Sequence, residues 1–555
     1  MPRRRRSYAA PTRRAGSVLM SSTPARARHR RRSPLGGGRW IAVLLLLVVA
    51  GAIAGGVVAV QRHRQANDRR RAAARAFIAA WGRRDLGAMY DQTAPSSRPS
   101  FAVFKRSYAA ANRAAGTRKL VLGAPGALDG GAVRVRVAVR TDDFGVLRGS
   151  VAIPTVDEDG HGRVAWTPAL RLPGLRRGER PVRDAGPAPE PGNVLAADGT
   201  VLANDATGSG IAGVPAAGDQ PATGLERLYA DRLSGHPSET LRFGDRVIRR
   251  VHAAAGRDVH ATVDLGLTHV AESALAGRLG GVAVIKPRSG SVLALAGLAV
   301  SAPQPPGSTF KIITLSGALQ HHVVKTTDSF PVAQYAVLSG VKLHNASDET
   351  CGGALPTAFA ESCNSVFAPL GAKLGAKRLV ATAERFGFNE QPNIPAAKPA
   401  QIAHDLKDDL AVGAAAIGQD RDLATPLAMA SVGATIANGG QRAVPRIVRE
   451  EPVRKRRAIR RTVAAQVRDM MIGVVQGGTG TAAALPGVTV AGKTGTAELV
   501  PTQGGASDPK NTDAWFVAFA PAEAPKVAVA VMLVGAGAGG AAAAPVARQV
   551  LAAAL

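Results

Sequence analysis

The sequence predicts a multidomain chain of the α/β (α+β) class, and three observations lead to this prediction. The 555 residues are enough to form several domains. An uncharged apolar stretch, Trp40–Val60, is long enough for one membrane-spanning helix. Helix-like and strand-like patterns then follow one another between turns rich in Gly and Pro, and the second half of the chain carries three polar motifs.

The N-terminal segment is basic and lacks the pattern of a folded domain. Twelve arginines precede residue 40 and no acidic residue accompanies them, so residues 1–39 are predicted to be a disordered tail. Because this positive charge lies ahead of the apolar stretch, we expect residues 40–60 to be a single-pass anchor in the cytoplasmic membrane, with the N-terminus in the cytoplasm. Both the basic lead and the apolar core are longer than those of a cleaved signal peptide. Residues 61–555 would then be extracytoplasmic.

The whole chain is also basic, with 70 Lys+Arg against 40 Asp+Glu and a formal net charge of +30. Such a balance often indicates nucleic-acid binding. However, aromatic residues for base stacking make up only 4% of the chain, and no recognition motif is present. We therefore expect no nucleic-acid partner. Either an arginine-rich coding bias or attraction to anionic lipid or wall polymer accounts for the charge.

Residues 61–175 are predicted to form a small domain of helices followed by an antiparallel sheet. Apolar residues recur at helical spacing over residues 69–91, and Phe101–Ala115 gives a second helix. Strand-like stretches separated by Gly and Asp turns follow at residues 119–122, 133–139, 146–153 and 163–167. This order resembles the small cone of NTF2-like domains. Residues 176–270 follow and contain a Pro- and Gly-rich stretch at residues 187–192.

The chemistry of the C-terminal part, residues 271–555, is indicated first by Ser308 and Lys311. A Pro-Pro-Gly sequence precedes Ser308, and an apolar run to Leu319 predicts a helix. Residues three apart share one face of a helix, so the hydroxyl and the amine can meet. A serine hydroxyl is a weak nucleophile until a base takes its proton, and burial would favour the neutral lysine that can do so.

Two other pairs with the same spacing are weaker candidates. Ser339 and Lys342 enclose Gly and Val where a helix would have to run, and Ser507 and Lys510 enclose a proline. Neither pair is therefore expected to lie on one helix face.

Two further motifs, each present once, strengthen the assignment of Ser308. They are Ser362-Cys363-Asn364 and Lys493-Thr494-Gly495-Thr496. Their order and wide spacing resemble the motif set of penicillin-binding proteins and serine β-lactamases. Further stretches resemble parts of a penicillin-binding transpeptidase domain: the first hairpin at residues 281–294, the long interior helix at 424–430, and the strand after the Lys-Thr-Gly strand at 515–521.

Residues 271–555 are thus similar to the transpeptidase (penicillin-binding) domain of class B-type penicillin-binding proteins, which is an antiparallel sheet flanked by helices. In that family, an NTF2-like domain and a dimerisation or linker module precede the core in some members, which matches residues 61–175 and 176–270. The usual motifs of the linker module are degraded here. No segment before residue 271 resembles a glycosyltransferase domain, so the resemblance implies a monofunctional enzyme.

The resemblance implies a serine-type D,D-transpeptidase that cross-links peptidoglycan stem peptides at D-Ala-D-Ala through an acyl-enzyme, with possible D,D-carboxypeptidase side activity. β-Lactams would acylate the same serine. The implied catalytic residues are the nucleophile Ser308, the base Lys311, the proton relay Ser362 and Lys493 as a fixed positive charge. The implied substrate-binding residues are Asn364, Thr494, Gly495 and Thr496. A membrane glycosyltransferase or the division or elongation machinery is the implied partner, and no cofactor is expected.

The two cysteines, Cys351 and Cys363, flank the loop that carries the second motif. In an oxidising exterior they are able to close a short disulfide that steadies this loop, and two buried free thiols are the alternative. We expect no metal site, because His321, His322 and His344 lack a ligand-like spacing.

Two other functions fit the same motifs or the same architecture. A β-lactamase or β-lactam sensor shares the three motifs, although the large segment ahead of the core argues against a β-lactamase. A catalytically silent cell-wall scaffold would act through the N-terminal domains, but it has no need of intact Ser308, Lys311, Ser362 and Lys493. A glycine-rich turn, Gly535–Gly540, matches a dinucleotide-binding pattern but lacks the strand and acidic residue that should follow. It is better explained as a turn into a terminal helix.

Overall fold

The computed structural model describes the backbone of residues 38–346, 349–498 and 509–555, and the side chains of residues 38–54 and 509 lie outside this description. Most of the predicted tail, residues 1–39, and part of the Ser507–Lys510 pair also lie outside it. The predicted anchor Trp40–Val60 falls within one long helix, α1 (Gly38–Arg83). A search of the described residues finds no helix with the length and apolarity to cross a membrane.

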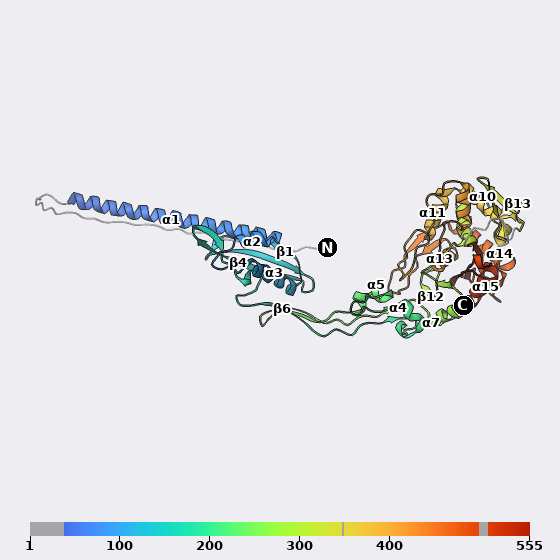
Figure 1. Ribbon diagram of the computed structural model, residues 1–555, viewed down its shortest axis with the longest axis horizontal. Coiled ribbons are helices and arrows are strands. Elements are labelled where there is room, and N and C mark those ends of the chain that lie inside the picture. The colour runs from blue at the N-terminus through green and yellow to red at the C-terminus, as the bar shows by residue number, and fades with distance from the viewer. Residues whose placement is uncertain (1–37, 347–348, 499–508) are drawn as a thin grey trace, which may run out of the picture. The chain divides into compact units, whose positions relative to one another are not determined.

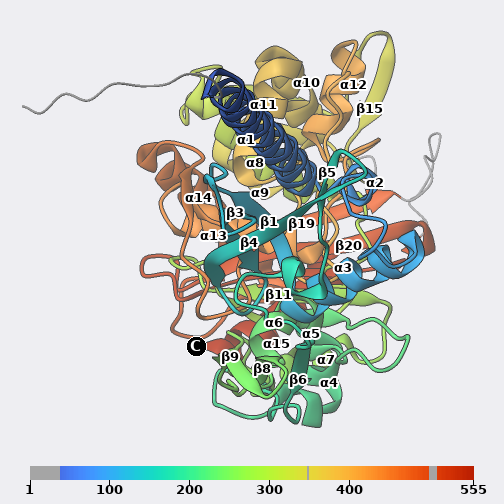
Figure 2. The same cartoon turned by 90° about the vertical axis from the view of Figure 1, so that its left-hand side faces the viewer.

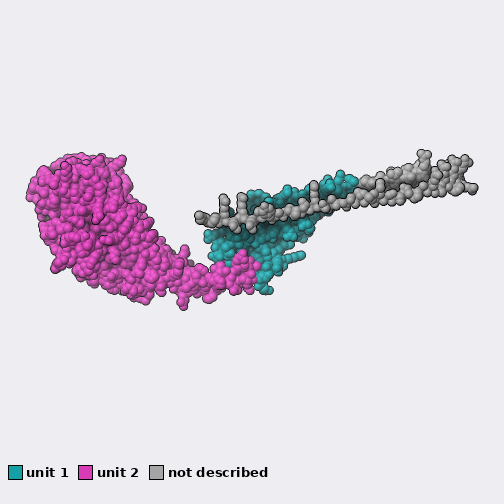
Figure 3. Space-filling model, turned by 180° about the vertical axis from the view of Figure 1, so that it is seen from behind, with its two compact units in different colours: residues 1–182, 243–246 teal, residues 183–242, 247–555 magenta. Residues whose placement is uncertain are grey.

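The described chain separates into two compact units, which Figure 3 shows in different colours. Unit 1 comprises residues up to 182 together with 243–246, and unit 2 comprises residues 183–242 and 247–555. The first predicted boundary, at residue 175, lies close to the change of unit at 182, whereas the second, at 270, lies inside unit 2.

Unit 1 consists of three helices and an antiparallel sheet of order β1-β3-β4-β5, with β2 paired to β3. After α1 come α2 (Leu86–Asp91), α3 (Phe101–Ala115), β1 (Thr117–Leu122), β2 (Leu128–Asp129), β3 (Ala132–Thr141), β4 (Val146–Glu158), β5 (His161–Val164) and the 3-10 helix η1 (Pro168–Arg171). Alternate residues of β3 are buried, from Val133 to Val139, so one sheet face packs against the helices. The predicted helix-then-sheet order is therefore observed.

Several short elements connect this sheet with the large core. Strands β6 (Pro181–Ala185), β8 (Glu239–Phe243) and β9 (Arg246–Val251) form one small sheet, and β7 (Val194–Leu195) pairs in parallel with β10 (Val259–His260). Between them lie η2 (Leu202–Asn204), α4 (Ala206–Ala212), α5 (Gly224–Leu228) and α6 (Ala230–Leu233).

The centre of unit 2 is a five-stranded antiparallel sheet of order β12-β11-β21-β20-β19. Its strands are β11 (Gly280–Ile285), β12 (Val292–Gly297), β19 (Ala491–Glu498), β20 (Thr512–Ala520) and β21 (Val527–Leu533). Every residue of β11, β20 and β21 is buried, as expected for strands covered on both faces. The first and last parts of the domain thus meet in one sheet, with β19 at its edge.

Helices cover both faces of this sheet. On one face, α7 (Leu265–Leu275) and α15 (Gly539–Ala554) pack against residues such as Val282 and Val284. On the other face, α8 (Lys311–Gln320), α13 (Pro426–Ala437) and α14 (Arg461–Gly477) cover Ala283 and Ile285. The start of α15 at Gly539 agrees with the predicted turn into a terminal helix.

Most of the remaining elements lie on the α8 side of the sheet, whereas the 3-10 helix η5 (Thr481–Ala483) packs against α15. The others are β13 (Ser329–Ala333), β14 (Tyr335–Leu338), β15 (Val341–His344), β16 (Cys351–Ala354), α9 (Leu355–Ala360), α10 (Asn364–Leu374), α11 (Ala376–Phe386), α12 (Asp409–Ala416), β17 (Gln441–Ala443), β18 (Lys455–Arg457) and η6 (Pro509–Asn511). Figure 2 shows α10, α11 and α12 together at one end of unit 2, with α4 and α7 at the other.

The edge strand β19 begins close to the third motif. Val488 and Val490 alternate as they would in a strand, but β19 starts only at Ala491. Val488 instead pairs with Leu485 in an isolated bridge, because a turn with Gly487 at a positive φ of 70° reverses the chain there.

Candidate active site

Ser308 lies in a 3-10 turn that leads directly into α8. The turn, η3 (Gly307–Phe310), starts at a glycine with φ of 52° and is followed at once by Lys311, the first residue of α8. Residues three apart eclipse each other in a 3-10 turn, so Ser308 and Lys311 lie on the same side. Ser308 is partly exposed, whereas Lys311 has no exposed surface. The predicted helix start is thus a tighter turn, with the nucleophile candidate at the surface and the lysine beneath it.

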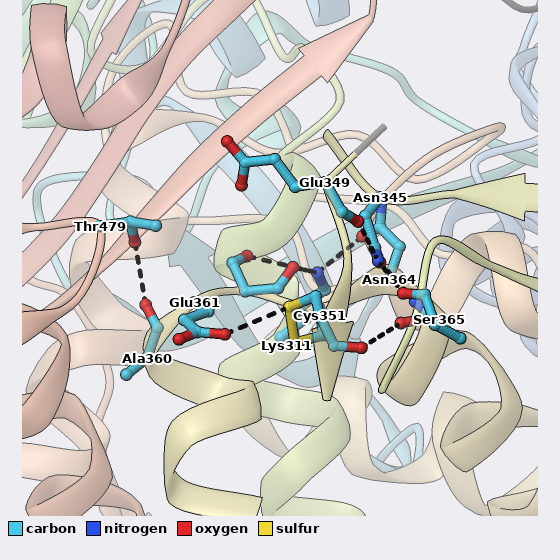
Figure 4. Close-up of a disulfide and its surroundings, with 12 residues drawn as sticks. Lys311, Asn345, Glu349, Cys351, Ala360, Glu361, Asn364, Ser365 and Thr479 are labelled. Atoms are coloured by element: carbon cyan, nitrogen blue, oxygen red, sulfur yellow. Dashed lines mark hydrogen bonds between the residues drawn. A yellow bond between two sulfur atoms is a disulfide. The ribbon is translucent and has the colours of Figure 1, made fainter. Parts of the chain in front are cut away.

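The second motif forms the loop between α9 and α10. Ser362 has a positive φ of 67°, a strained conformation for a residue other than glycine. The next residue, Cys363, forms a disulfide with Cys351 at the start of β16, across a Cα–Cα distance of 5.4 Å. The predicted disulfide is therefore present, and Figure 4 shows that it lies beside Lys311 and Asn364. It ties the loop of Ser362 to a strand and so restricts the loop's movement.

Lys311 connects the first motif to the second. Its Nζ donates a hydrogen bond of 2.7 Å to Oδ1 of Asn364 (Figure 4). It also donates to the carbonyl oxygen of Ser362 at 2.6 Å and lies 3.3 Å from Oγ of Ser362. Within the described residues, no hydrogen bond joins Lys311 to the Ser308 hydroxyl. The amide of Asn364 is held in turn by donation from Nδ2 to the carbonyl of His344.

Burial lowers the pKa of Lys311 well below its usual value, and the nearby Lys493 lowers it further. A neutral amine has two N–H groups and one lone pair. The two short hydrogen bonds use both N–H groups, so the lone pair remains for a proton from a neighbouring hydroxyl. Lys311 therefore has the lone pair that its predicted role as a base requires.

Lys493 reaches the same serine from the opposite side. It lies in the edge strand β19, has no exposed surface, and donates to Oγ of Ser362 at 2.8 Å and to the carbonyl of Thr494 at 3.1 Å. Burial lowers the pKa of Lys493 to about 7. The prediction of a fixed positive charge is therefore wrong in one respect, because desolvation makes this amine titrate near neutrality.

Thr494 and Thr496 are held by groups that the motifs did not predict. Oγ1 of Thr494 shares a hydrogen bond of 2.6 Å with Oγ1 of Thr479, and the backbone N–H of Gly539 donates to Oγ1 of Thr496 at 3.3 Å. Thr479 lies in a glycine-rich turn after α14. Thr479 was not identified from the sequence, because a lone threonine in such a turn has no catalytic pattern.

Gly495 of the third motif and its neighbour Gly492 are required by the protein's own packing. A Cβ on Gly495 would stand 2.9 Å from the carbonyl oxygen of Pro306, and a Cβ on Gly492 would stand 2.6 Å from the ring of Phe516. The lack of a side chain at Gly495 thus lets β19 approach the turn of Ser308.

One group of side chains has the composition of a metal site. Potential ligand atoms of Cys351, Glu361 and Cys363 lie within 4.8 Å of one another. The two cysteines are joined in a disulfide and so provide no thiolate ligand.

Three motifs that are far apart in the sequence therefore meet around Ser362. A partly exposed serine, a buried lysine with a lone pair, a serine held by two lysines and a strand edge with two hydroxyls are the groups that nucleophilic catalysis by a serine requires.

Comparison with known proteins gives the family. The penicillin binding protein transpeptidase domain family matches residues 280–552. The peptidoglycan D,D-transpeptidases PbpA of Mycobacterium tuberculosis and Mycolicibacterium smegmatis are 38% and 40% identical over 286 residues, which are 46% of this chain and 56% of each relative. The chain thus spans little more than half the length of these curated relatives.

Solved structures agree with this match. A D,D-transpeptidase domain from Eggerthella lenta is 31% identical, with a TM-score of 0.58 over 66% of this chain and 99% of that one. The penicillin G acyl-enzyme complex of penicillin-binding protein A from M. tuberculosis is 27% identical, with a TM-score of 0.54. The match covers 66% of this chain and 100% of that one. The chain belongs to the penicillin-binding protein transpeptidase family.

Proposed function

We propose that this protein is a serine-type D,D-transpeptidase that cross-links peptidoglycan stem peptides. The observation that carries the proposal is the contact of two buried lysines with one serine, Ser362, next to the turn of Ser308. The names of the relatives support the same reaction, since PbpA is described as a peptidoglycan D,D-transpeptidase and penicillin-binding protein A forms acyl-enzymes with β-lactams.

Acylation begins at the Ser308 hydroxyl, which is the accessible nucleophile of the site. Ser308 Oγ attacks the carbonyl carbon between two D-alanines while Lys311 takes the hydroxyl proton. The tetrahedral intermediate then collapses as its C–N bond breaks, and the terminal D-alanine leaves with a proton from Ser362. Lys311 lies 3.3 Å from Ser362 Oγ, so it is placed to return the first proton to Ser362.

Substrate recognition falls to the edge strand β19 and to Asn364. Thr494 and Thr496 offer hydroxyls, and protonated Lys493 offers positive charge to the terminal carboxylate of the stem peptide. Backbone N–H groups of Ser308 and Thr496 would stabilise the oxyanion. The amide of Asn364 is both donor and acceptor, which suits a peptide bond.

The acyl group is then transferred from Ser308 to an acceptor. Attack by the amine of another stem peptide forms the cross-link, and attack by water gives the trimmed peptide of a D,D-carboxypeptidase. A β-lactam has the same acyl chemistry, so it acylates Ser308 and leaves slowly. A membrane glycosyltransferase, or the division or elongation machinery, is the partner that fits this role.

We also infer the topology and the division of the chain. Residues 40–60 form a membrane anchor, residues 1–39 a cytoplasmic tail, residues 61–175 an NTF2-like domain and residues 176–270 a linker module. The transpeptidase domain, residues 271–555, would work outside the cytoplasmic membrane. The uncharged apolar segment and the arginines that precede it support this inference.

The first experiment labels the protein with a fluorescent penicillin and locates the adduct by peptide mass spectrometry. We expect a long-lived adduct on Ser308 that is absent from Ser308→Ala. The protein is then incubated with lipid-linked precursor and a glycosyltransferase. The appearance of cross-linked dimer shows that the amine of a second stem peptide is the acyl acceptor. In the labelling experiment, rapid loss of the adduct indicates a β-lactamase, and no adduct on folded protein contradicts the proposal. In the cross-linking experiment, trimmed monomer without cross-linked dimer indicates a carboxypeptidase.

A further inference from the structure

Unit 1 contains a cavity of about 80 Å³ that the proposed catalytic function does not use. It lies between the end of α1, α3 and the sheet, and its walls are formed by apolar side chains that include Trp81, Leu120 and Val139. The exposed residues Arg84 and Asn112 line it on the solvent side, and the buried residues Tyr108 and Arg171 line it on the inside. The cavity therefore leads from solvent to a polar interior.

Two hydroxyls of this cavity donate to no acceptor among the described residues. Tyr108 is 2% exposed, and its hydroxyl oxygen lies beside the indole N–H of Trp166 but its own O–H has no acceptor, while Oγ1 of Thr117 is buried and has no partner. Burial raises the pKa of Tyr108, so its hydroxyl keeps its proton and remains a donor. Buried polar groups in proteins nearly always have a partner, because leaving one unpaired is costly. These hydroxyls fit a site whose ligand supplies the missing acceptor.

The charge of the cavity is positive. Arg171 is 8% exposed and donates to two backbone carbonyls, of Pro168 at 2.6 Å and of Ser107 at 3.4 Å. No carboxylate pairs with it in the described part of the chain. Arg84 adds a second guanidinium on the solvent side, and no acidic residue lines the cavity. A buried cation without a counter-ion favours an anion in the adjoining space.

We propose that this cavity is a binding site for a small organic carboxylate. The two carboxylate oxygens would accept hydrogen bonds from the guanidinium of Arg171 and from the hydroxyls of Tyr108 and Thr117. The apolar walls would surround a short aliphatic substituent, which distinguishes this ligand from inorganic phosphate. The site lies entirely within unit 1, so the proposal does not depend on the reaction at Ser308.

The test uses the full-length protein in detergent, with propionate and inorganic phosphate as probes at constant ionic strength. Binding is measured from the broadening of the propionate proton NMR lines and from thermal unfolding. We expect saturable propionate binding that Tyr108→Phe weakens about tenfold or more, since a hydrogen bond to a charged group is lost.

Tyr90→Phe is the matched control in the same unit. The hydroxyl of Tyr90 already donates to the carbonyl of Pro99 at 2.8 Å, so its removal should lower stability and leave propionate binding unchanged. Thr117→Val tests the second unpaired hydroxyl and is also expected to weaken binding. A cooperative thermal unfolding transition of unit 1 confirms that each variant is folded.

Three results would overturn the proposal. They are absence of saturable propionate binding, propionate binding that neither Tyr108→Phe nor Thr117→Val weakens, and phosphate binding tighter than propionate binding.

Discussion

At the scale of single residues, the two buried lysines decide how the site works. Lys311 and Lys493 both contact Ser362 and both are fully buried, yet their hydrogen bonds differ. Lys311 donates two short bonds that leave a lone pair, whereas Lys493 donates to Ser362 Oγ and to the carbonyl of Thr494. Two cations so close together would repel each other, so the site favours one neutral lysine and one that is able to carry charge.

The first prediction concerns Lys311. Replacing it by methionine keeps an apolar side chain of similar length but removes the base, so the rate of Ser308 acylation by benzylpenicillin should fall by about 10²–10⁴-fold. Stopped-flow or gel-based labelling measures this rate. Lys377→Met, which changes an exposed lysine of α11, serves as control and should leave the rate unchanged. A Lys311→Met rate close to that of the wild type would exclude Lys311 as the base.

The second prediction concerns pH. Because burial lowers the pKa of Lys493 to about 7, this amine loses its proton as pH rises through neutrality. The protonated form attracts the ligand carboxylate, so the second-order acylation constant should fall by roughly tenfold per pH unit above about pH 7. The second-order constant reports the free enzyme, whereas the first-order acylation rate reports the enzyme with ligand bound. A bound carboxylate raises the pKa of Lys493, so the first-order rate should begin to fall at a higher pH than the second-order constant.

Lys493→Arg provides the comparison for this pH profile. Arginine keeps its charge at all these pH values, so the variant should lose the alkaline fall even if its acylation is slower. The profile is measured with benzylpenicillin from about pH 6 to pH 9. A flat wild-type profile over that range would contradict a role for the charge of Lys493.

At the scale of elements, the site depends on how β19, η3 and the loop of Ser362 are held against one another. Gly495 and Gly307 bring the edge strand β19 against the turn of Ser308, since a Cβ on either would collide with backbone. The disulfide joins the loop of Ser362 to β16. Ser362 itself keeps a left-handed backbone, which persists only when its surroundings enforce it.

The third prediction concerns this disulfide. Replacing Cys351 and Cys363 by serine should lower the free energy of unfolding by about 2–3 kcal/mol, as expected for a short closed loop. It should also slow Ser308 acylation, because Ser362 and Asn364 then hold Lys311 less firmly. Denaturant unfolding and labelling rates are measured on the same samples. A reducing agent added to wild type should reproduce both effects, and unchanged acylation in the reduced protein would show that the loop is held without the disulfide.

At the scale of the whole molecule, the candidate active site and the carboxylate site belong to different units. Ser308 and its partners lie in unit 2, whereas Tyr108 and Arg171 lie in unit 1. Each site can therefore be altered without changing the residues of the other. The proposed anchor, residues 40–60, precedes both sites in the sequence and contributes no residue to either of them.

The fourth prediction concerns the anchor. The full chain should sediment with membranes and resist extraction by carbonate, whereas a chain lacking residues 1–60 should be soluble and acylate Ser308 at a rate within about twofold of the full chain. Protease added outside spheroplasts should degrade residues 61–555 and spare a tag at residue 1. Degradation of the tag would reverse the proposed orientation, and a soluble full chain would exclude the anchor.

The sequence by itself determined the motifs, their order and most elements. Helix Phe101–Ala115, the β11–β12 hairpin and the terminal helix follow from local patterns, because apolar periodicity and turn residues act over a few positions. Ser308, Lys311, Ser362 and Lys493 were found because each motif has its own spacing. The cysteines were seen to flank one loop, but their distance was not encoded locally.

Only the tertiary structure decided what these residues contact. The hydrogen bonds of Lys311 go to Ser362 and Asn364, which are more than fifty positions away in the chain. The pKa of Lys493 depends on complete burial beneath segments distant in sequence, and Thr479 meets Thr494 only through the packing of α14 on β19. Hydrogen bonding and desolvation depend on neighbours in space, and folding brings these neighbours together from separate parts of the chain.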